Sequence, residues 1–194
     1  MPDYVTFAVL SLTLLLTPGP TNTLLAVAGA SAGLKSWLVM APAELAGYLI
    51  AIHVLAFGIG PLIPAQAQFA VKIACALYLV VLAVMLWRAQ TPLIRQEIIT
   101  PRRVFIVTLL NPKALIFTFV ILPRLPGQWL AALPYLAGLC ALIVAASLCW
   151  IGLGTGLGSG RLGHISQQNI RRTGAVALAV FALVIVTSRA TLSG

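Results

Sequence analysis

Three observations predict that this chain folds as one all-α integral membrane domain. Of its 194 residues, 61% are apolar and only 8% are charged, and the mean hydropathy is +1.07. About a quarter of the residues in a typical soluble domain are charged, so too few polar side chains exist here to cover a water-facing surface. The apolar residues fall in six runs, each near the ~20 residues that a membrane-spanning helix needs. Too little sequence remains between them for another domain, so we expect one membrane domain over residues 1–194.

The six apolar runs are continuous rather than alternating, which favours helices over the strands of a membrane barrel. The last run is the weakest span, because its strongly apolar part begins only at Ala175. The predicted spans are Tyr4–Ala28, Leu38–Gly60, Ala67–Trp87, Val104–Leu122, Leu130–Leu153 and Ile170–Ser188.

The net charge of +9 comes mainly from residues between the apolar runs. Such placement indicates membrane topology and contact with anionic lipid headgroups rather than nucleic-acid binding. The loops after spans 1, 3 and 5 hold Lys35, Arg88, Arg95, Arg102, Arg103, Arg161, Arg171 and Arg172. The opposite side holds Lys72, Arg124 and Arg189, together with Asp3. Because basic loops stay in the cytoplasm, we expect the first side to be cytoplasmic and both termini to be extracytoplasmic.

Proline interrupts two of the spans at corresponding places. Span 1 contains Thr17-Pro18-Gly19-Pro20 followed by Asn22, and span 4 contains Asn111-Pro112-Lys113. The two segments lie about half the chain apart, and each half holds three spans. An odd number of spans inverts the second half relative to the first. The sequence therefore predicts two inverted three-helix repeats, approximately 1–97 and 98–194.

These prolines suggest that spans 1 and 4 are each built from two half-helices. Thr17 and Asn111 can serve as N-caps, with Pro18 and Pro112 at the first helical positions. Freed backbone groups in a membrane need protein or water as partners, and each half-helix start carries unpaired N–H groups and a positive dipole end. Broken helices at matched positions indicate a transporter's binding site. The alternative is that these prolines only kink their spans.

The same residues resemble the signatures of a known family. Thr17-Pro18-Gly19-Pro20 with Asn22 resembles the first-span signature T-P-G-P-N of the LysE/RhtB family of amino-acid exporters, with Thr21 in place of the motif's Asn. Leu109-Leu110-Asn111-Pro112-Lys113 resembles its second signature, L-N-P-K. Span number, chain length and motif order also agree. The resemblance implies a bacterial inner-membrane exporter of amino acids or close derivatives, driven by the proton gradient.

Three ionisable side chains inside the spans are candidates for function. Glu44 is the only acid well inside a span, and an intramembrane carboxylate suggests a proton relay or a partner for a substrate ammonium; a structural partner for a base is the alternative. Tyr48 lies one helical turn later and can bind substrate or only pack. Lys113 can bind a substrate carboxylate or extend toward headgroups. The candidate substrate-binding residues are Thr17, Pro18, Gly19, Pro20, Asn22, Glu44, Tyr48, Asn111, Pro112 and Lys113.

The sequence therefore predicts a secondary active amino-acid exporter that works by alternating access. The alternatives are an uncoupled channel or an exporter of another small solute or metal ion. The three cysteines, Cys75, Cys140 and Cys149, form no paired motif with metal-ligand spacing. No Walker A, H-E-x-x-H or G-x-S-x-G motif is present, so we expect neither a cofactor nor an enzyme. The expected partners are an amino acid and membrane lipid, with a second copy of the chain as a further possibility.

Overall fold

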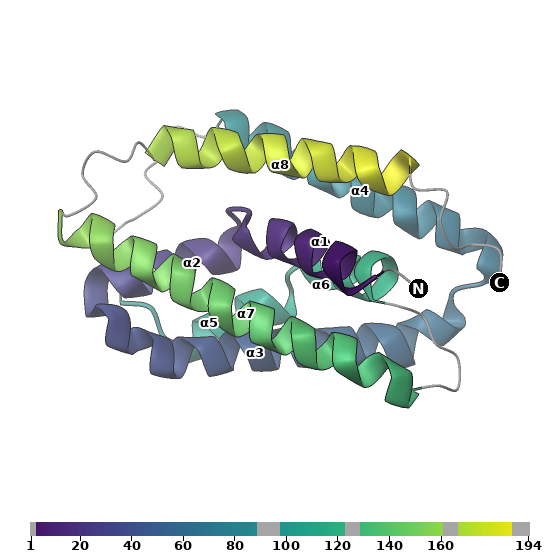
Figure 1. The fold of residues 1–194 in the computed structure, drawn as a ribbon, viewed down its shortest axis with the longest axis horizontal. Helices are drawn as coiled ribbons and strands as arrows, with labels where there is room; N and C mark the ends of the chain where they lie inside the picture. The colour runs from purple at the N-terminus through teal and green to yellow at the C-terminus, as the bar shows by residue number, and fades with distance from the viewer. Residues whose placement is uncertain (1–2, 89–97, 123–128, 161–166, 188–194) are drawn as a thin grey trace.

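The computed structural model describes residues 3–88, 98–122, 129–160 and 167–187 as an elongated helical bundle (Figure 1). The described residues contain no strand. The α-helices are α1 (Tyr4–Leu16), α2 (Pro20–Ala32), α3 (Trp37–His53), α4 (Ala65–Arg88), α5 (Pro101–Leu109), α6 (Lys113–Ile116), α7 (Trp129–Gly158) and α8 (Gln167–Thr187). Short 3₁₀ and π segments complete them: η1 (Leu34–Ser36), η2 (Val54–Ile59), η3 (Gly60–Leu62) and η4 (Phe117–Ile121).

Several of these helices are long and apolar enough to cross a membrane, as the composition predicts. Three continuous stretches meet this condition: Leu34–Leu62, Phe69–Arg88 and Ala132–Gly158. Two bent pairs meet it jointly: Tyr4–Leu16 with Pro20–Ala32, bent by 64°, and Pro101–Leu109 with Lys113–Ile121, bent by 51°. The apolar part of α8, Arg172–Thr187, is shorter. The all-helical membrane fold is therefore confirmed, whereas the count of six spans stays a prediction.

Both predicted breaks are present, but the first half-helix begins later than the sequence suggests. Thr17 does not cap α2, because its backbone is extended and its hydroxyl donates to the Thr13 carbonyl oxygen at 2.6 Å. Instead α2 begins at Pro20, after an extended Gly19. A proline suits this first position, since its missing N–H would have no intrahelical partner there. At the second break α6 begins at Lys113, directly after Pro112.

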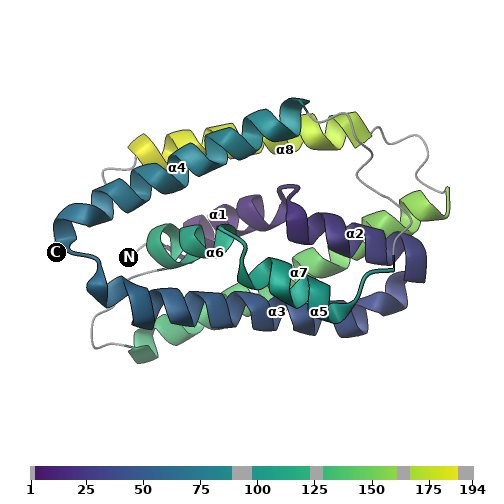
Figure 2. The same ribbon diagram turned by 180° about the vertical axis from the view of Figure 1, so that it is seen from behind.

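The helices run roughly along the long axis of the bundle, and the chain reverses direction after α2, α3, α4, α6 and α7 (Figures 1 and 2). The last turns of α2, α4 and α7 and the first turns of α3, α5 and α8 lie toward the same end, on the left of Figure 1. The described residues at these helix ends include Lys35, Arg88, Arg102, Arg103 and Arg172. We call this the basic end. The predicted grouping of basic loops on one side agrees with this arrangement.

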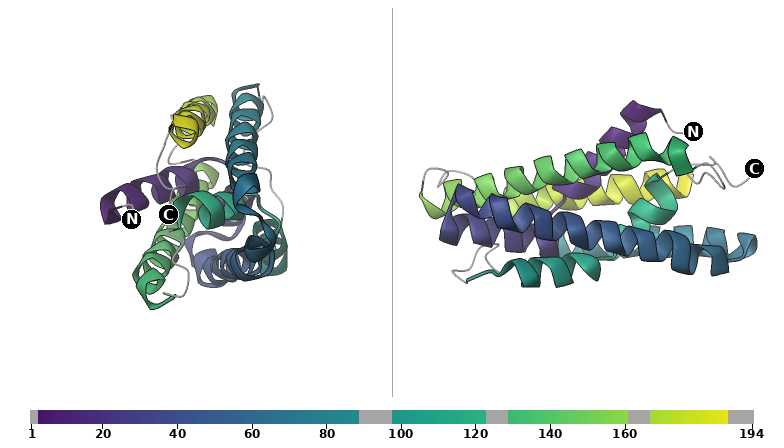
Figure 3. Two further views of the ribbon diagram at one scale, coloured as in Figure 1. Left: turned by 90° about the vertical axis from the view of Figure 1, so that its right-hand side faces the viewer. Right: turned by 90° about the horizontal axis from the view of Figure 1, so that it is seen from below.

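Two packed groups of helices make up the bundle. One group joins α2, α3, α5 and α7, and the other pairs α4 with α8 along their length. The view along the bundle shows α4 and α8 beside each other, with α1 and α6 between them and the other helices (Figure 3). A large cluster of buried apolar residues extends across this boundary and includes Leu15, Tyr48, Leu79, Phe117 and Leu178. The buried residues of both breaks, among them Pro18, Asn111 and Lys113, therefore lie between the two groups.

Candidate functional site

At the first break, side chains from three helices cover the carbonyl oxygens that end α1. The Asn22 Nδ2 donates to the carbonyl oxygens of Leu15 at 2.6 Å and Thr17 at 2.7 Å. The Lys113 ammonium also donates to the Thr17 carbonyl, at 2.8 Å, and the Trp150 indole reaches the Leu15 carbonyl at 3.3 Å. Breaking a helix inside a membrane exposes such carbonyls, and buried ones need partners. These contacts supply them.

The Lys113 side chain thus crosses from the second break to the first. Its backbone belongs to α6, but its ammonium lies at the C-terminal end of α1, which is the negative end of that helix dipole. Gly19 leaves room for this crossing, because a Cβ there would lie 3.3 Å from the Lys113 Cε and 3.4 Å from its Nζ. From its place in the sequence alone, the Lys113 ammonium would lie at the N-terminal end of α6, where the positive end of the helix dipole repels a cation. The contact with Thr17 removes that conflict.

At the second break, Asn111 acts on the backbone and joins the two halves. Its Oδ1 accepts a hydrogen bond from the Lys113 backbone N–H at 3.0 Å, which caps α6. Its Nδ2 donates to the Thr21 hydroxyl at 3.1 Å, and the Thr108 hydroxyl lies 3.2 Å from the same oxygen. Thr21 stands where the family signature has Asn. The sequence showed this departure from the motif but gave no sign that Thr21 contacts Asn111.

Glu44 and Ser147 form a buried polar pair between α3 and α7. Glu44 is 1% exposed, and its carboxyl group is hydrogen-bonded to the Ser147 hydroxyl. The same hydroxyl lies 2.9 Å from the Ile143 carbonyl oxygen. A hydroxyl has one proton to donate and can also accept. It can therefore donate to an ionised Glu44, or donate to Ile143 while accepting from a protonated Glu44. The contact suits either protonation state.

Glu44, Lys113 and Tyr48 converge on the interior from α3 and α6. Lys113 is 1% exposed and interacts electrostatically with Glu44. Tyr48 follows Glu44 by one helical turn, interacts with it electrostatically and is fully buried. Its ring packs edge-to-face on Phe117, with centroids 5.6 Å apart. One buried cation, one buried carboxyl group and one phenol thus share the centre of the bundle.

An apolar groove of about 460 Å³ lies beside the second break, between α3 with η2 and α5 with α6. Leu110 at its rim is 75% exposed. The groove is lined by Ile50, Ala51, Val54, Leu55, Leu109, Leu110, Asn111, Pro112, Ala114 and Leu115. The first break has a different setting, because Pro18 is buried. It packs directly on Gly174 of α8, where a Cβ would lie only 2.5 Å from the Pro18 Cδ.

The structure thus brings most of the predicted site residues into one network. Thr17, Asn22, Asn111 and Lys113 are joined by hydrogen bonds directly or through Thr21, and Gly19 gives the network space. Glu44 and Tyr48 face it from α3. The ring of Pro20 is exposed. Sequence reasoning missed Thr21, Thr108, Ser147 and Trp150, because contacts between helices this far apart in the chain leave no spacing pattern.

The described residues contain no group of three or more His, Cys, Asp or Glu side chains that could hold a metal ion. The three cysteines are free, and only Cys75 is buried.

Comparison with known families identifies the chain. The family model described as LysE type translocator matches residues 12–189, which is nearly the whole chain. No curated protein and no solved structure gives a match. The chain belongs to the LysE type translocator family, a family of membrane transporters.

Proposed function

We propose that this LysE type translocator is a secondary active exporter of amino acids or close derivatives across the bacterial inner membrane, driven by the proton gradient. One observation carries the proposal: a buried ammonium and a buried carboxyl group lie on different helices beside two helix breaks. Ionisable residues inside a membrane protein are expensive and indicate function. A pair of opposite sign suits a zwitterion.

The proposed binding mode assigns each end of an amino acid to one buried group. The substrate carboxylate binds Lys113, whose ammonium has three N–H donors and spends one on the Thr17 carbonyl. The substrate ammonium meets Glu44. Asn22 and Asn111 hold the broken backbone around the substrate and complete the site. In this scheme Lys113 serves both the protein and the ligand without breaking its present contact.

Proton coupling is assigned to Glu44. The Ser147 hydroxyl can act as donor or acceptor toward Glu44, so the carboxyl group keeps a hydrogen bond in both protonation states. A carrier needs such a group to load a proton on one side and release it on the other. The same carboxylate, when ionised, attracts the substrate ammonium, so proton and substrate use it in turn.

Alternating access is assigned to the two predicted inverted repeats. Toward the basic end α2 packs along α7, whereas on the other side of the breaks the four-residue α6 makes only a short contact with α3. In the predicted repeat α6 corresponds to α2, and α3 corresponds to α7. A carrier that exchanges the packing of its two halves needs this kind of asymmetry in each of its end states. The positive-inside rule makes the basic end cytoplasmic and both termini extracytoplasmic in a six-span arrangement.

Amino-acid efflux from bacterial cells loaded with mixed dipeptides tests the proposal. Cells making the wild-type protein should release one or a few amino acids faster than cells without it. Lys113→Ala and Glu44→Gln should abolish the gain, while Lys35→Ala, which changes an exposed lysine at the basic end, should keep it. Membrane levels of each variant are compared by immunoblot.

Each outcome has a defined reading. Faster efflux that survives both site substitutions would keep an exporter but remove this site. No gain for any amino acid, with the wild-type protein present in the membrane, would contradict the proposal and favour another small solute or a channel.

A further inference from the structure

Tyr48 carries a polar group for which the part of the chain that the structure describes supplies no hydrogen-bond partner. Its side chain is fully buried, and its hydroxyl oxygen neither donates nor accepts a hydrogen bond in the structure. Glu44 and Tyr78 interact with it electrostatically, but neither is bonded to it. An unpaired buried hydroxyl destabilises a fold, whereas a phenylalanine of the same shape would not. The ring's packing on Phe117 needs no hydroxyl.

The position of this hydroxyl relates it to the proposed substrate site. Residues one helical turn apart point from the same face of a helix, so the Tyr48 phenol projects beside the Glu44 carboxyl group. Lys113 interacts with Glu44 from α6. In an amino acid held by Lys113 and Glu44, the side chain is the part that remains free. We expect it to lie against the face of α3 that carries Glu44, where Tyr48 is the next residue.

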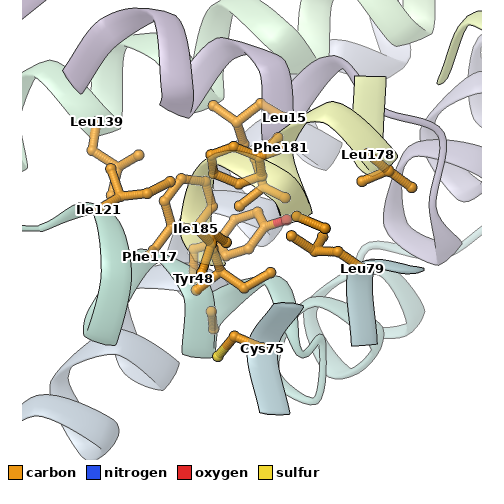
Figure 4. Close-up of a cluster of buried hydrophobic side chains, with 14 of the residues drawn as sticks. Leu15, Tyr48, Cys75, Leu79, Phe117, Ile121, Leu139, Leu178, Phe181 and Ile185 are labelled. Atoms are coloured by element: carbon orange, nitrogen blue, oxygen red, sulfur yellow. The ribbon is translucent and has the colours of Figure 1, made fainter. Parts of the chain in front are cut away.

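Apolar side chains from α4 and α8 surround this position. Figure 4 shows the Tyr48 hydroxyl oxygen on the side toward Leu79 and Leu178, with Phe181 nearby. Leu79 comes from α4, Leu178 and Phe181 come from α8, and all belong to the same buried cluster as Tyr48. The side chains of Leu79, Leu178 and Phe181 offer no polar atom to a group that enters among them. A charged group that entered it would lose its hydration without gaining a partner.

We propose that Tyr48 and the apolar cluster of Leu79, Leu178 and Phe181 form the subsite for the substrate's side chain, with the Tyr48 hydroxyl hydrogen-bonded to the substrate. This inference rests on the proposed function and narrows it. The substrates are neutral amino acids with largely apolar side chains, and cationic and anionic side chains are excluded. Substrate entry requires the cluster to open between Tyr48 and the α4–α8 pair.

The test combines stability and transport of the purified full-length protein. Tyr48→Phe removes only the orphan hydroxyl, so the melting temperature without substrate should stay unchanged or rise. Its KM for leucine or threonine in proteoliposomes should increase roughly five- to tenfold, as loss of one hydrogen bond predicts. Thr187→Val is the control, because the Thr187 hydroxyl is exposed at the end of α8 and bonds only to carbonyls of its own helix, and it should change neither quantity.

A second pair of variants tests the apolar wall. Leu178→Ala enlarges the proposed subsite and should shift selectivity severalfold toward larger neutral side chains. Leu183→Ala shortens an exposed leucine on the same helix and should leave selectivity unchanged. Flux of leucine, threonine, lysine and glutamate is compared for each protein, and the wild type should prefer a neutral substrate over lysine and glutamate by at least about tenfold.

The outcomes separate this inference from the proposal beneath it. Transport that prefers lysine or glutamate, or an unchanged KM in Tyr48→Phe, would overturn the side-chain subsite and leave the exporter intact. Unchanged selectivity in Leu178→Ala would overturn the assigned wall. A wild-type protein that moves none of the four amino acids, and that releases no amino acid from dipeptide-loaded cells, would overturn both proposals.

Discussion

The two helix breaks occur at proline-containing motifs in matched positions, but their surroundings differ. The first bends its span by 64° and lies in the interior, where Asn22, Lys113 and Trp150 bind the carbonyls that end α1. The second bends by 51°, is capped by its own Asn111 and borders an apolar groove. A proline at matched positions in two halves therefore sets where a helix breaks, while tertiary packing decides what the break contacts.

The helices that follow the breaks differ in the same way. Backbone contacts join α2 to α7, since a Cβ on Gly29 would overlap the Ile151 carbonyl and one on Gly154 would overlap the Ala26 carbonyl. In the corresponding pair α6 is only one turn long before it passes into the π segment η4, and its contact with α3 is correspondingly short. Glycine lets helix backbones approach closely in membranes. One half is thus tightly joined at its break and the other is loosely joined.

The largest expected effect comes from the residue that connects the breaks. Lys113→Met removes the donor to Thr17 and leaves a buried Glu44 without its cation. Removing a charged donor from a buried carbonyl and the nearby cation from Glu44 should lower the free energy of unfolding by about 3 kcal/mol or more. Denaturant unfolding in detergent micelles measures it. The double variant Lys113→Met/Glu44→Gln should recover part of the stability but no transport. Equal stability of Lys113→Met and wild type would show that the breaks are not coupled through this side chain.

A smaller loss is expected where α2 meets α7. Gly154→Ala puts a methyl group against the Ala26 carbonyl and should destabilise the protein by about 1–3 kcal/mol, as overpacking does. Gly152 lies two residues away on the same helix with nothing near its would-be Cβ. Gly152→Ala should be neutral or stabilising by up to about 1 kcal/mol, because alanine favours helix. Denaturant unfolding of both variants measures the difference. Equal effects of Gly154→Ala and Gly152→Ala would refute the close contact between α2 and α7.

The two asparagines allow the breaks to be compared directly. Asn22→Ala removes two hydrogen bonds to buried carbonyls and should lower the unfolding free energy by about 2–3 kcal/mol. Asn111→Ala removes a cap and a bond to Thr21 and should lower it by about 1 kcal/mol. A larger loss of unfolding free energy in Asn111→Ala than in Asn22→Ala would contradict this prediction.

The smallest effect is expected at the open side of the second break. Leu110 is 75% exposed, so Leu110→Ala should change the unfolding free energy by less than about 0.5 kcal/mol. A change of several kcal/mol in the same assay would mean that another surface covers this leucine.

The sequence predicted the elements that depend on local residue types. Apolar runs located the helices, and the prolines located both breaks. The first half-helix was placed two residues early, because no local pattern shows that the Thr17 hydroxyl turns back to Thr13. The destination of the Lys113 side chain and the Glu44–Ser147 pair depend on how distant helices pack. Thr21 shows the same limit: its type was visible, but its contacts with Asn111 and Thr108 were not.

Counterflow in proteoliposomes tests the central claim most directly, namely that the two breaks enclose one alternating amino-acid site. Vesicles loaded with a neutral amino acid should accumulate the labelled form from outside against its gradient, and a proton gradient should alter net flux. Lys113→Met should abolish both, while Lys35→Met should keep both. Labelled amino acid that only equilibrates, or counterflow that persists in Lys113→Met, would contradict the account.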